Sequence, residues 1–435
     1  MIQSKKLARY VHPKILSRLA AGTKEYLSVI IYSNDTCESL QKCILDAGGE
    51  VKYSIPLINA VAAKIPAKRI NEIASHHMIQ YINDDSKVFK CMNIASTCIA
   101  HSMANETGYT GKGVGIAILD TGVYPHDDLT KPTNRIVAFK DFVNDRTEPY
   151  DDDGHGTHVA GIATGNGYVN QKYKGIAPEA NIIGVKVLDE TGSGNTSDIL
   201  AGIQWVVDNK EKYNIKVLNM SFGSPADKVY HQDPLAKAAS AAVNSGLTVV
   251  AAAGNNGPNR GTITSPGNSP SVITVGAADD NRTTSYEDDF VAEFSSRGPA
   301  PGGVAKPNIV APGVDIMSLA NKSASYTSQS GTSMATPMVA GAAALLYERN
   351  PNLSPSEVRS RIIRTAIPIQ GNRFAQGAGI LNIQGMIDLD DAGAQHPRSP
   401  VPRRPAPAKP IRPNTPNRFP FAIDPVLLFF LLFFL

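Results

Sequence analysis

The sequence predicts an α/β protein with a mainly parallel sheet and helices on both faces, preceded by a small ferredoxin-like α+β domain. Over residues 102–391, short apolar runs alternate with helical patterns, which is typical of a parallel sheet covered on both sides. Over residues 25–90, the expected order is strand, helix, strand, strand, helix, strand. The chain has 435 residues, which is enough for both units.

The elements of the small domain follow from local patterns. We expect helices over 36–47 and 67–75, and strands over 27–32, 50–55, 60–66 and 79–83. The preceding residues 1–24 contain six Lys and Arg, no acid and little periodicity, so we expect a basic N-terminal extension there. Residues 91–101 would then link the small domain to the larger one.

In the larger domain, the apolar run at residues 114–119 predicts a buried parallel strand that ends at Asp120. Open α/β sheets place their sites at the carboxyl ends of their strands, so Asp120 is expected in such a site. A helix is predicted from the run at 158–163, and another from the Ala-rich stretch 334–347. Pro337 is expected in the first turn of that second helix, where a missing N–H costs little.

Three segments carry an acid, an imidazole and a hydroxyl. Asp120 lies in segment 118–122, His155 in 154–158 and Ser333 in 331–337. A serine hydroxyl becomes a useful nucleophile when an imidazole accepts its proton, and that imidazole needs a carboxylate to fix its tautomer. Each of these residue types is common, but all three within Gly- or Thr-rich turns form a specific signal for a catalytic triad.

These segments resemble the three signature motifs of the subtilase family of serine peptidases. The resemblance spans nearly all of residues 102–391 and includes segments 187–194, 219–223, 294–299 and 306–313. In architecture and length the chain is similar to the compact bacterial type called AprX. The resemblance implies a subtilisin-like fold and a serine endopeptidase that works through an acyl-enzyme. It also implies that the chemistry needs no cofactor.

The segment 251–255 ends in Asn255, and the resemblance implies that its side-chain amide donates to the oxyanion of the tetrahedral intermediate. The alternative is that Asn255 caps a turn. The resemblance further implies that polypeptide substrates add a strand between two backbone segments and fill a pocket with room for a large apolar side chain. The two backbone segments are Gly192, Ser193 and Gly194, and Ser221, Phe222 and Gly223; the pocket residues are Ala252, Gly254 and Thr264.

By the same resemblance, residues 25–90 are an inhibitory propeptide that the enzyme removes by cutting its own chain between Ser86 and Met103. The alternative is an unrelated small α/β domain that stays attached. The resemblance also implies a structural calcium ion. Its ligands would be Asp128 and, from the loop 165–170, Asn166. The alternative there is an Asn/Gly turn with no ion. His158 lies one helical turn after His155 and is expected to be a packed structural histidine.

Other functions are disfavoured. The basic excess lies in the two terminal segments, so the body between them is mildly acidic, which argues against a nucleic-acid partner. A catalytically silent subtilase scaffold would usually lack a triad residue. A dehydrogenase would need a dinucleotide-binding fingerprint, and no zinc-ligand spacing or phosphate loop occurs in the sequence.

Residues 392–425 predict an extended linker, because ten prolines fall between 397 and 425. The apolar tail 426–435 spans roughly 15 Å as a helix, about half a bilayer core. Three interpretations of this tail stay open: a membrane-dipping anchor helped by the basic linker, a partner-docking segment, or an accident of the reading frame. The N-terminus has no apolar stretch of signal-peptide length, so we expect a cytoplasmic protein. All four cysteines precede residue 102, so the catalytic region needs no disulfide.

Overall fold

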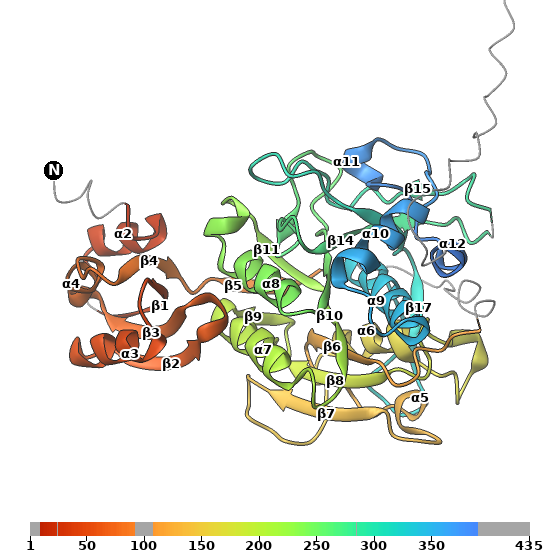
Figure 1. Ribbon diagram of the computed structural model, residues 1–435, viewed down its shortest axis with the longest axis horizontal. Helices are drawn as coiled ribbons and strands as arrows, with labels where there is room; N and C mark the ends of the chain where they lie inside the picture. The colour runs from red at the N-terminus through yellow and green to blue at the C-terminus, as the bar shows by residue number, and fades with distance from the viewer. Residues whose placement is uncertain (1–8, 24, 92–107, 284, 390–435) are drawn as a thin grey trace, which may run out of the picture. The chain divides into compact units, whose positions relative to one another are not determined.

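The computed structural model describes residues 9–23, 25–91, 108–283 and 285–389 (Figure 1). The predicted linker 392–425, the tail 426–435 and all but the first residue of the linker 91–101 lie outside the described residues. Among the residues described, none of the helices combines the length and the apolarity needed to cross a membrane.

The N-terminal domain has the predicted ferredoxin-like order. Its sheet is antiparallel and runs β2-β3-β1-β4, which confirms the fold class. Its elements are β1 (Tyr26–Ser33), α3 (Cys37–Asp46), β2 (Glu50–Ile55), β3 (Ala60–Pro66), α4 (Ile70–Ala74) and β4 (Ile79–Asp84).

The two faces of β1 serve different cores, because side chains alternate along a strand. Val29 and Ile31 pack against the helices of the N-terminal domain. Ile30 and Tyr32 belong to a second cluster that also contains Leu200 of the larger domain. The small sheet therefore buries one face in its own domain and the other against the larger domain.

The structure differs from the sequence prediction before residue 24. Helix α2 (Pro13–Ala20) lies within the expected extension, begins with a proline and is capped by the His12 side chain. Ile15 is fully buried in the core of the N-terminal domain, as is Val11, which forms a bridge with Ile82 of β4. Residues 9–23 are therefore part of the small domain.

The larger domain contains an eight-stranded, mostly parallel sheet, as predicted (Figure 1). Its strands follow the order β15-β14-β12-β10-β6-β8-β7, with β16 also paired to β14. Only β15 runs antiparallel to its neighbour within this sheet. The strands are β6 (Gly115–Asp120), β7 (Ile136–Asp141), β8 (Asn181–Lys186), β10 (Ile215–Met220), β12 (Thr248–Ala252), β14 (Ile273–Asp279), β15 (Phe290–Val291) and β16 (Ile309–Pro312).

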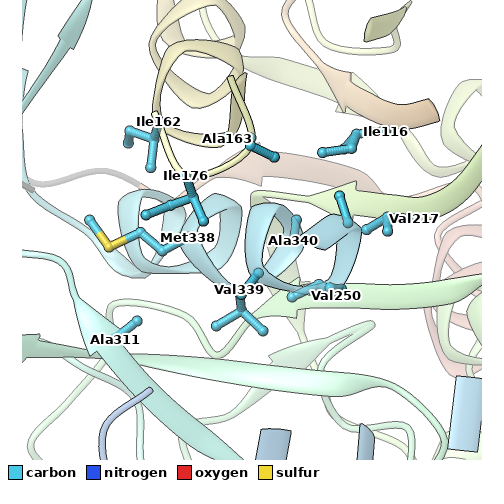
Figure 2. Close-up of a cluster of buried hydrophobic side chains, with 14 of the residues drawn as sticks. Ile116, Ile162, Ala163, Ile176, Val217, Val250, Ala311, Met338, Val339 and Ala340 are labelled. Carbon is cyan, nitrogen blue, oxygen red and sulfur yellow. The ribbon is translucent and has the colours of Figure 1, made fainter. Parts of the chain in front are cut away.

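Helices cover both faces of this sheet. On one face, α6 (His155–Thr164) and α9 (Thr332–Arg349) pack against the strands, where Val339 and Ala340 lie beside Val217 and Val250 (Figure 2). On the other face lie α7 (Thr196–Asn209) and α8 (Pro234–Asn244). Shorter elements complete the domain: α5 (Asp127–Thr130), α10 (Pro355–Thr365), α11 (Arg373–Gln376), α12 (Ile383–Asp388) and the hairpin β17 (Ile316–Leu319) with β18 (Tyr326–Gln329).

A separate four-stranded sheet joins the two domains. It has the order β13-β11-β5-β9. Its strands are β13 (Thr264–Ser265), β11 (Phe222–Pro225), β5 (Lys87–Lys90) and β9 (Ser193–Asn195). Strand β5 follows the N-terminal domain in the chain, whereas its two neighbours, β9 and β11, belong to the larger domain.

Candidate active site

Asp120 and His155 form a buried pair at the carboxyl end of β6, an interior strand of the main sheet. Asp120 is the last residue of β6, as predicted, and His155 is the first residue of α6. The His155 Nδ1 lies 2.7 Å from Asp120 Oδ1, and both side chains are fully buried. A carboxylate at Nδ1 fixes the proton on that nitrogen and leaves Nε2 as the base.

The aspartate Asp151 organises the turn before His155. Gly154 adopts a left-handed conformation with φ 101° and donates its N–H to Asp151 Oδ1 at 2.8 Å. The other oxygen of Asp151 accepts from the Thr157 N–H at 2.8 Å and from the Thr157 hydroxyl at 2.6 Å. Sequence reasoning missed this residue, although three consecutive aspartates before the motif were its signal.

Ser333 lies in the first turn of α9 with its hydroxyl directed at two carbonyl oxygens. Its Oγ is 2.5 Å from the Cys91 oxygen and 2.6 Å from the Ser221 oxygen. A hydroxyl has one proton and donates to one of these oxygens at a time. Nε2 of His155 is buried and has no hydrogen-bond partner among the described residues. The structure thus gathers the three predicted residues, but it shows the Asp–His contact and not a Ser–His bond.

Pro337 lies deeper in its helix than predicted. It is the sixth residue of α9, beyond the first turn, and its missing N–H leaves the Ser333 carbonyl without a helical donor. Ser221 supplies the donor, because its Oγ lies 3.0 Å from the Ser333 oxygen. Asn219 in turn donates to Ser221 Oγ at 3.0 Å. These two hydrogen bonds tie the helix that carries Ser333 to the predicted substrate-binding segment 221–223.

Asn255 presents a free amide to the same region. Its Oδ1 accepts from the Thr332 N–H at 3.0 Å and from the Thr332 hydroxyl at 2.9 Å. Its Nδ2 is buried without a hydrogen-bond partner in the described part of the chain. The carbonyl end therefore caps α9, while the amide end donates to none of the described residues. The predicted oxyanion role and the alternative capping role use different atoms of one side chain.

The predicted substrate-binding backbone holds a segment of this same chain. On one side of β5, Val88 is the antiparallel partner of Gly194 and Phe89 that of Ser193. On the other side, Phe89 is the partner of Gly223 and Lys90 that of Phe222. The Lys90 N–H donates to Gly192 O at 2.9 Å, and the Cys91 N–H to Ser221 O at 3.4 Å. Strand addition is thus visible in the fold itself.

The side chains of this segment alternate between the protein and solvent. Val88 is fully buried in the apolar cluster that includes Leu188, whereas Phe89 is half exposed. The Lys90 ammonium contacts Asp153. Cys91 is buried, and burial followed by the negative charge of Asp120 raises the pKa of its thiol to about 12, so the thiol stays neutral.

The predicted pocket residues lie close to this segment. Thr264 pairs in β13 with Pro225 of β11, and its hydroxyl donates to Ala253 O at 3.2 Å. A Cβ on Gly254 would lie 2.6 Å from Thr264 Cγ2, so only glycine fits there. Ala252 ends β12 and is fully buried. The preference of this pocket for a large apolar side chain stays a prediction.

Both residues named as calcium ligands make hydrogen bonds within the protein. Asp128 Oδ1 accepts from the Val169 N–H at 2.8 Å, and its Oδ2 accepts from the Tyr326 hydroxyl at 2.8 Å. Asn166 uses its side chain for Tyr168 N–H and Lys131 O. Across the described residues, no cluster of three or more His, Cys, Asp or Glu side chains suits a metal ion. These contacts favour the alternative of a hydrogen-bonded turn, and calcium binding stays a prediction.

His158 has the structural role that was predicted. Its Nε2 lies 3.0 Å from the Ile316 oxygen and 3.1 Å from the Thr327 oxygen, so this nitrogen carries a proton and donates to backbone. Burial lowers the pKa of His158 to about 3, with a smaller contribution from His155. A neutral imidazole that is occupied in this way does not serve as a second base.

Comparison with known proteins gives one consistent result. A family model described as the subtilase family matches residues 111–386. The serine protease AprX of Bacillus subtilis (strain 168) is 41% identical over 368 residues, which cover 77% of this chain and 82% of the relative. Subtilisin E of the same organism is 36% identical over 382 residues, covering 85% and 93%. The solved structure of sphericase is similar with a TM-score of 0.56 and 33% identity, covering 66% of this chain and 94% of sphericase.

Proposed function

Because this chain belongs to the subtilase family of serine peptidases, we propose that it is a serine endopeptidase that first cuts its own chain between Cys91 and Met92. One observation carries the proposal. The Cys91 carbonyl faces the Ser333 hydroxyl at 2.5 Å while residues 87–90 fill the groove as a strand. This is where the bond to be cut would lie in a bound polypeptide.

The geometry supports the following steps. His155 Nε2 takes the proton of Ser333 Oγ, and Oγ attacks the Cys91 carbonyl carbon. The negative charge that develops on the carbonyl oxygen is stabilised by Asn255 Nδ2 and the backbone N–H of Ser333. His155 then gives its proton to the nitrogen of Met92, which leaves as an amine. Water attacks the acyl-enzyme with His155 as base and releases the Cys91 carboxylate.

Contacts between the domains support an inhibitory role for the N-terminal domain. Asp85 accepts from the Ser197 N–H at 2.8 Å and from the Ser197 hydroxyl at 2.7 Å, so it caps helix α7 from outside the catalytic domain. The Asp198 carboxylate pairs with Lys52 Nζ at 2.8 Å and accepts from the Tyr53 hydroxyl at 2.9 Å. A domain held in this way would remain docked after the cut and block the groove.

A binding scaffold without catalysis is the second candidate, because the Ser333 hydroxyl is not bonded to His155 in the structure. A fluorophosphonate probe separates the two candidates. An activated serine reacts with such a probe, whereas an unactivated one does not. Labelling of the wild type that is lost in Ser333→Ala supports the peptidase. A protein with an exposed groove that never reacts would be a scaffold.

The direct test compares purified wild type with Ser333→Ala. We expect the wild type to begin at Met92 by N-terminal sequencing and to digest casein, and Ser333→Ala to begin at Met1 and to leave casein intact. A start at Met1 in both proteins would reject self-processing. A wild type that also fails to digest casein would reject the peptidase proposal as a whole.

A further inference from the structure

The side chain of Lys90 makes a specific contact in the groove. Lys90 is the residue before Cys91, and its Nζ lies 2.5 Å from Asp153 Oδ2. Only 20% of the Lys90 side chain and 8% of the Asp153 side chain are exposed. A charge-assisted hydrogen bond that is largely shielded from water is stronger than an ion pair on an open surface.

Asp153 is one of three consecutive aspartates, and the three have different partners. Asp151 is occupied by the turn that leads into α6. Asp152 pairs with the fully buried Lys186, whose Nζ is 2.7 Å away. Asp153 Oδ1 accepts from the His155 N–H at 3.1 Å. Its second oxygen, Oδ2, contacts Lys90 of the segment that fills the groove.

The opposite wall of the subsite leaves room for a long side chain. Gly192 has φ 74°, a conformation that favours glycine, and its carbonyl accepts from the Lys90 N–H. A Cβ at Gly192 would overlap the Cδ and Cε atoms of Lys90. The absence of a side chain there makes space for the aliphatic stem of a basic residue, while Asp153 receives its charge.

We propose that this subsite selects substrates with Lys or Arg at the second residue before the bond that is cut, through Asp153. The inference rests on the proposed peptidase function and names its substrate class: polypeptides with a basic residue at that position. Because Asp153 also binds the N–H of His155, the cation is held next to the catalytic base. In self-cleavage after Cys91, Lys90 would be the basic residue that occupies this subsite.

The test uses the processed wild-type enzyme and two internally quenched peptides. Both contain Lys-Val-Phe-X-Ala before the bond to be cut, with X either lysine or norleucine. Norleucine keeps the aliphatic stem and lacks the ammonium group. We expect kcat/KM to be roughly tenfold or more higher for lysine, because a hydrogen bond between charged groups in such a site is lost with norleucine.

Two variants assign the effect to Asp153. Asp153→Asn keeps an oxygen for the His155 N–H but loses the charge, so the lysine-to-norleucine ratio of kcat/KM should fall close to one. Asp145→Asn removes the same charge from an exposed side chain that pairs with Lys140, and should keep the ratio. In the full chain, Lys90→Met should slow the appearance of the Met92 terminus, which tests the contact from the peptide side.

The outcomes are distinct. Hydrolysis of both peptides at equal kcat/KM by the wild type would overturn the subsite assignment and leave the peptidase function standing. A preference for lysine that persists in Asp153→Asn would overturn the role of Asp153. If neither peptide is cut in a Ser333-dependent way, the proposed function itself fails, and the substrate preference fails with it.

Discussion

The Ser221 hydroxyl donates to the Ser333 carbonyl oxygen across 3.0 Å, at the place where Pro337 cannot. Proline at this position removes the helical donor, and a side chain from the groove replaces it. This hydrogen bond therefore links the helix of Ser333 to the residue that precedes β11, and losing it should have a measurable cost in stability.

Ser221→Ala should lower the free energy of unfolding by roughly 1–3 kcal/mol, because it leaves a buried carbonyl without a donor. Pro337→Ala restores an N–H for that carbonyl, so Ser221→Ala should cost clearly less in that background. Urea unfolding of the four proteins in a Ser333→Ala background avoids self-digestion. Equal losses with and without Pro337 would show that the hydroxyl does not substitute for the missing helical donor.

Ser333→Ala and His155→Ala should each remove most proteolysis, and Asp120→Asn should cost nearly as much because it favours the wrong tautomer of His155. Casein digestion and peptide kinetics measure the effect. The thermal midpoint of Ser333→Ala provides the control for folding. Substantial activity in Asp120→Asn would contradict the role that the 2.7 Å contact assigns to Asp120.

Asn255→Ala should lower kcat with little change in KM. The expected cost is roughly 2.7–4 kcal/mol of transition-state stabilisation, which is the loss measured for such a donor in a subtilisin. Asn255→Asp keeps an acceptor for Thr332 and lacks the donor, so it should be at least as inactive but more stable than Asn255→Ala. A raised KM with an unchanged kcat in Asn255→Ala would argue for a capping role alone.

Asp85→Ala should weaken the docking of the N-terminal domain by roughly 1–2 kcal/mol, the usual value of a helix cap. After self-cleavage, peptidase activity should then appear sooner than in the wild type. Asp46→Ala is the control, because it removes an exposed aspartate from the same domain. It should leave the lag, which is the time between self-cleavage and the appearance of peptidase activity, unchanged. A lag that Asp85→Ala does not shorten would show that the cap contributes nothing to inhibition.

Asp289 should make stability depend on pH. Burial, followed by the charges of Asp280, Asp288 and Asp279, raises its pKa from 3.8 to about 6. A raised carboxyl pKa means that the folded protein binds the proton more tightly than the unfolded chain, so stability falls as pH rises from about 4 through about 6. Asp289→Asn should therefore be more stable than wild type at about pH 8, on the order of 1 kcal/mol, and equal to it near pH 3.5. Urea unfolding at the two pH values tests this, and a pH-independent difference would contradict it.

The loop around Asp128 should be stable without calcium. Treatment with EDTA should leave the thermal midpoint unchanged, because Val169 and Tyr326 occupy both carboxylate oxygens. Tyr326→Phe should lower the free energy of unfolding by roughly 1–3 kcal/mol, since it removes one of these donors. A midpoint that falls with EDTA and recovers with added Ca²⁺ would restore the calcium interpretation.

Much of the fold was predictable because the relevant signals are local. The apolar run before Asp120 predicted β6, and the small domain showed its strand and helix order in consecutive residues. Asp120, His155, Ser333 and Asn255 could be named as candidates because each lies in a short motif with characteristic turn residues beside it. These features depend on backbone conformation within a few positions, which the sequence specifies directly.

Other features depend on contacts between distant segments, and only the tertiary structure decided them. The sequence alone did not show that Ile15 would be buried with Ile82, so helix α2 was missed. Nor did it show that Val169 and Tyr326 would take the oxygens of Asp128.

The same holds for the substrate groove. By itself the sequence determined the fold class, the order of the triad and the backbone segments that bind a strand. The three-dimensional packing decided that Lys90 meets Asp153 and that Cys91 meets Ser333. The physical reason is that a side chain's charge and its hydrogen-bonding groups are local properties, whereas its partner is set by how the whole chain packs.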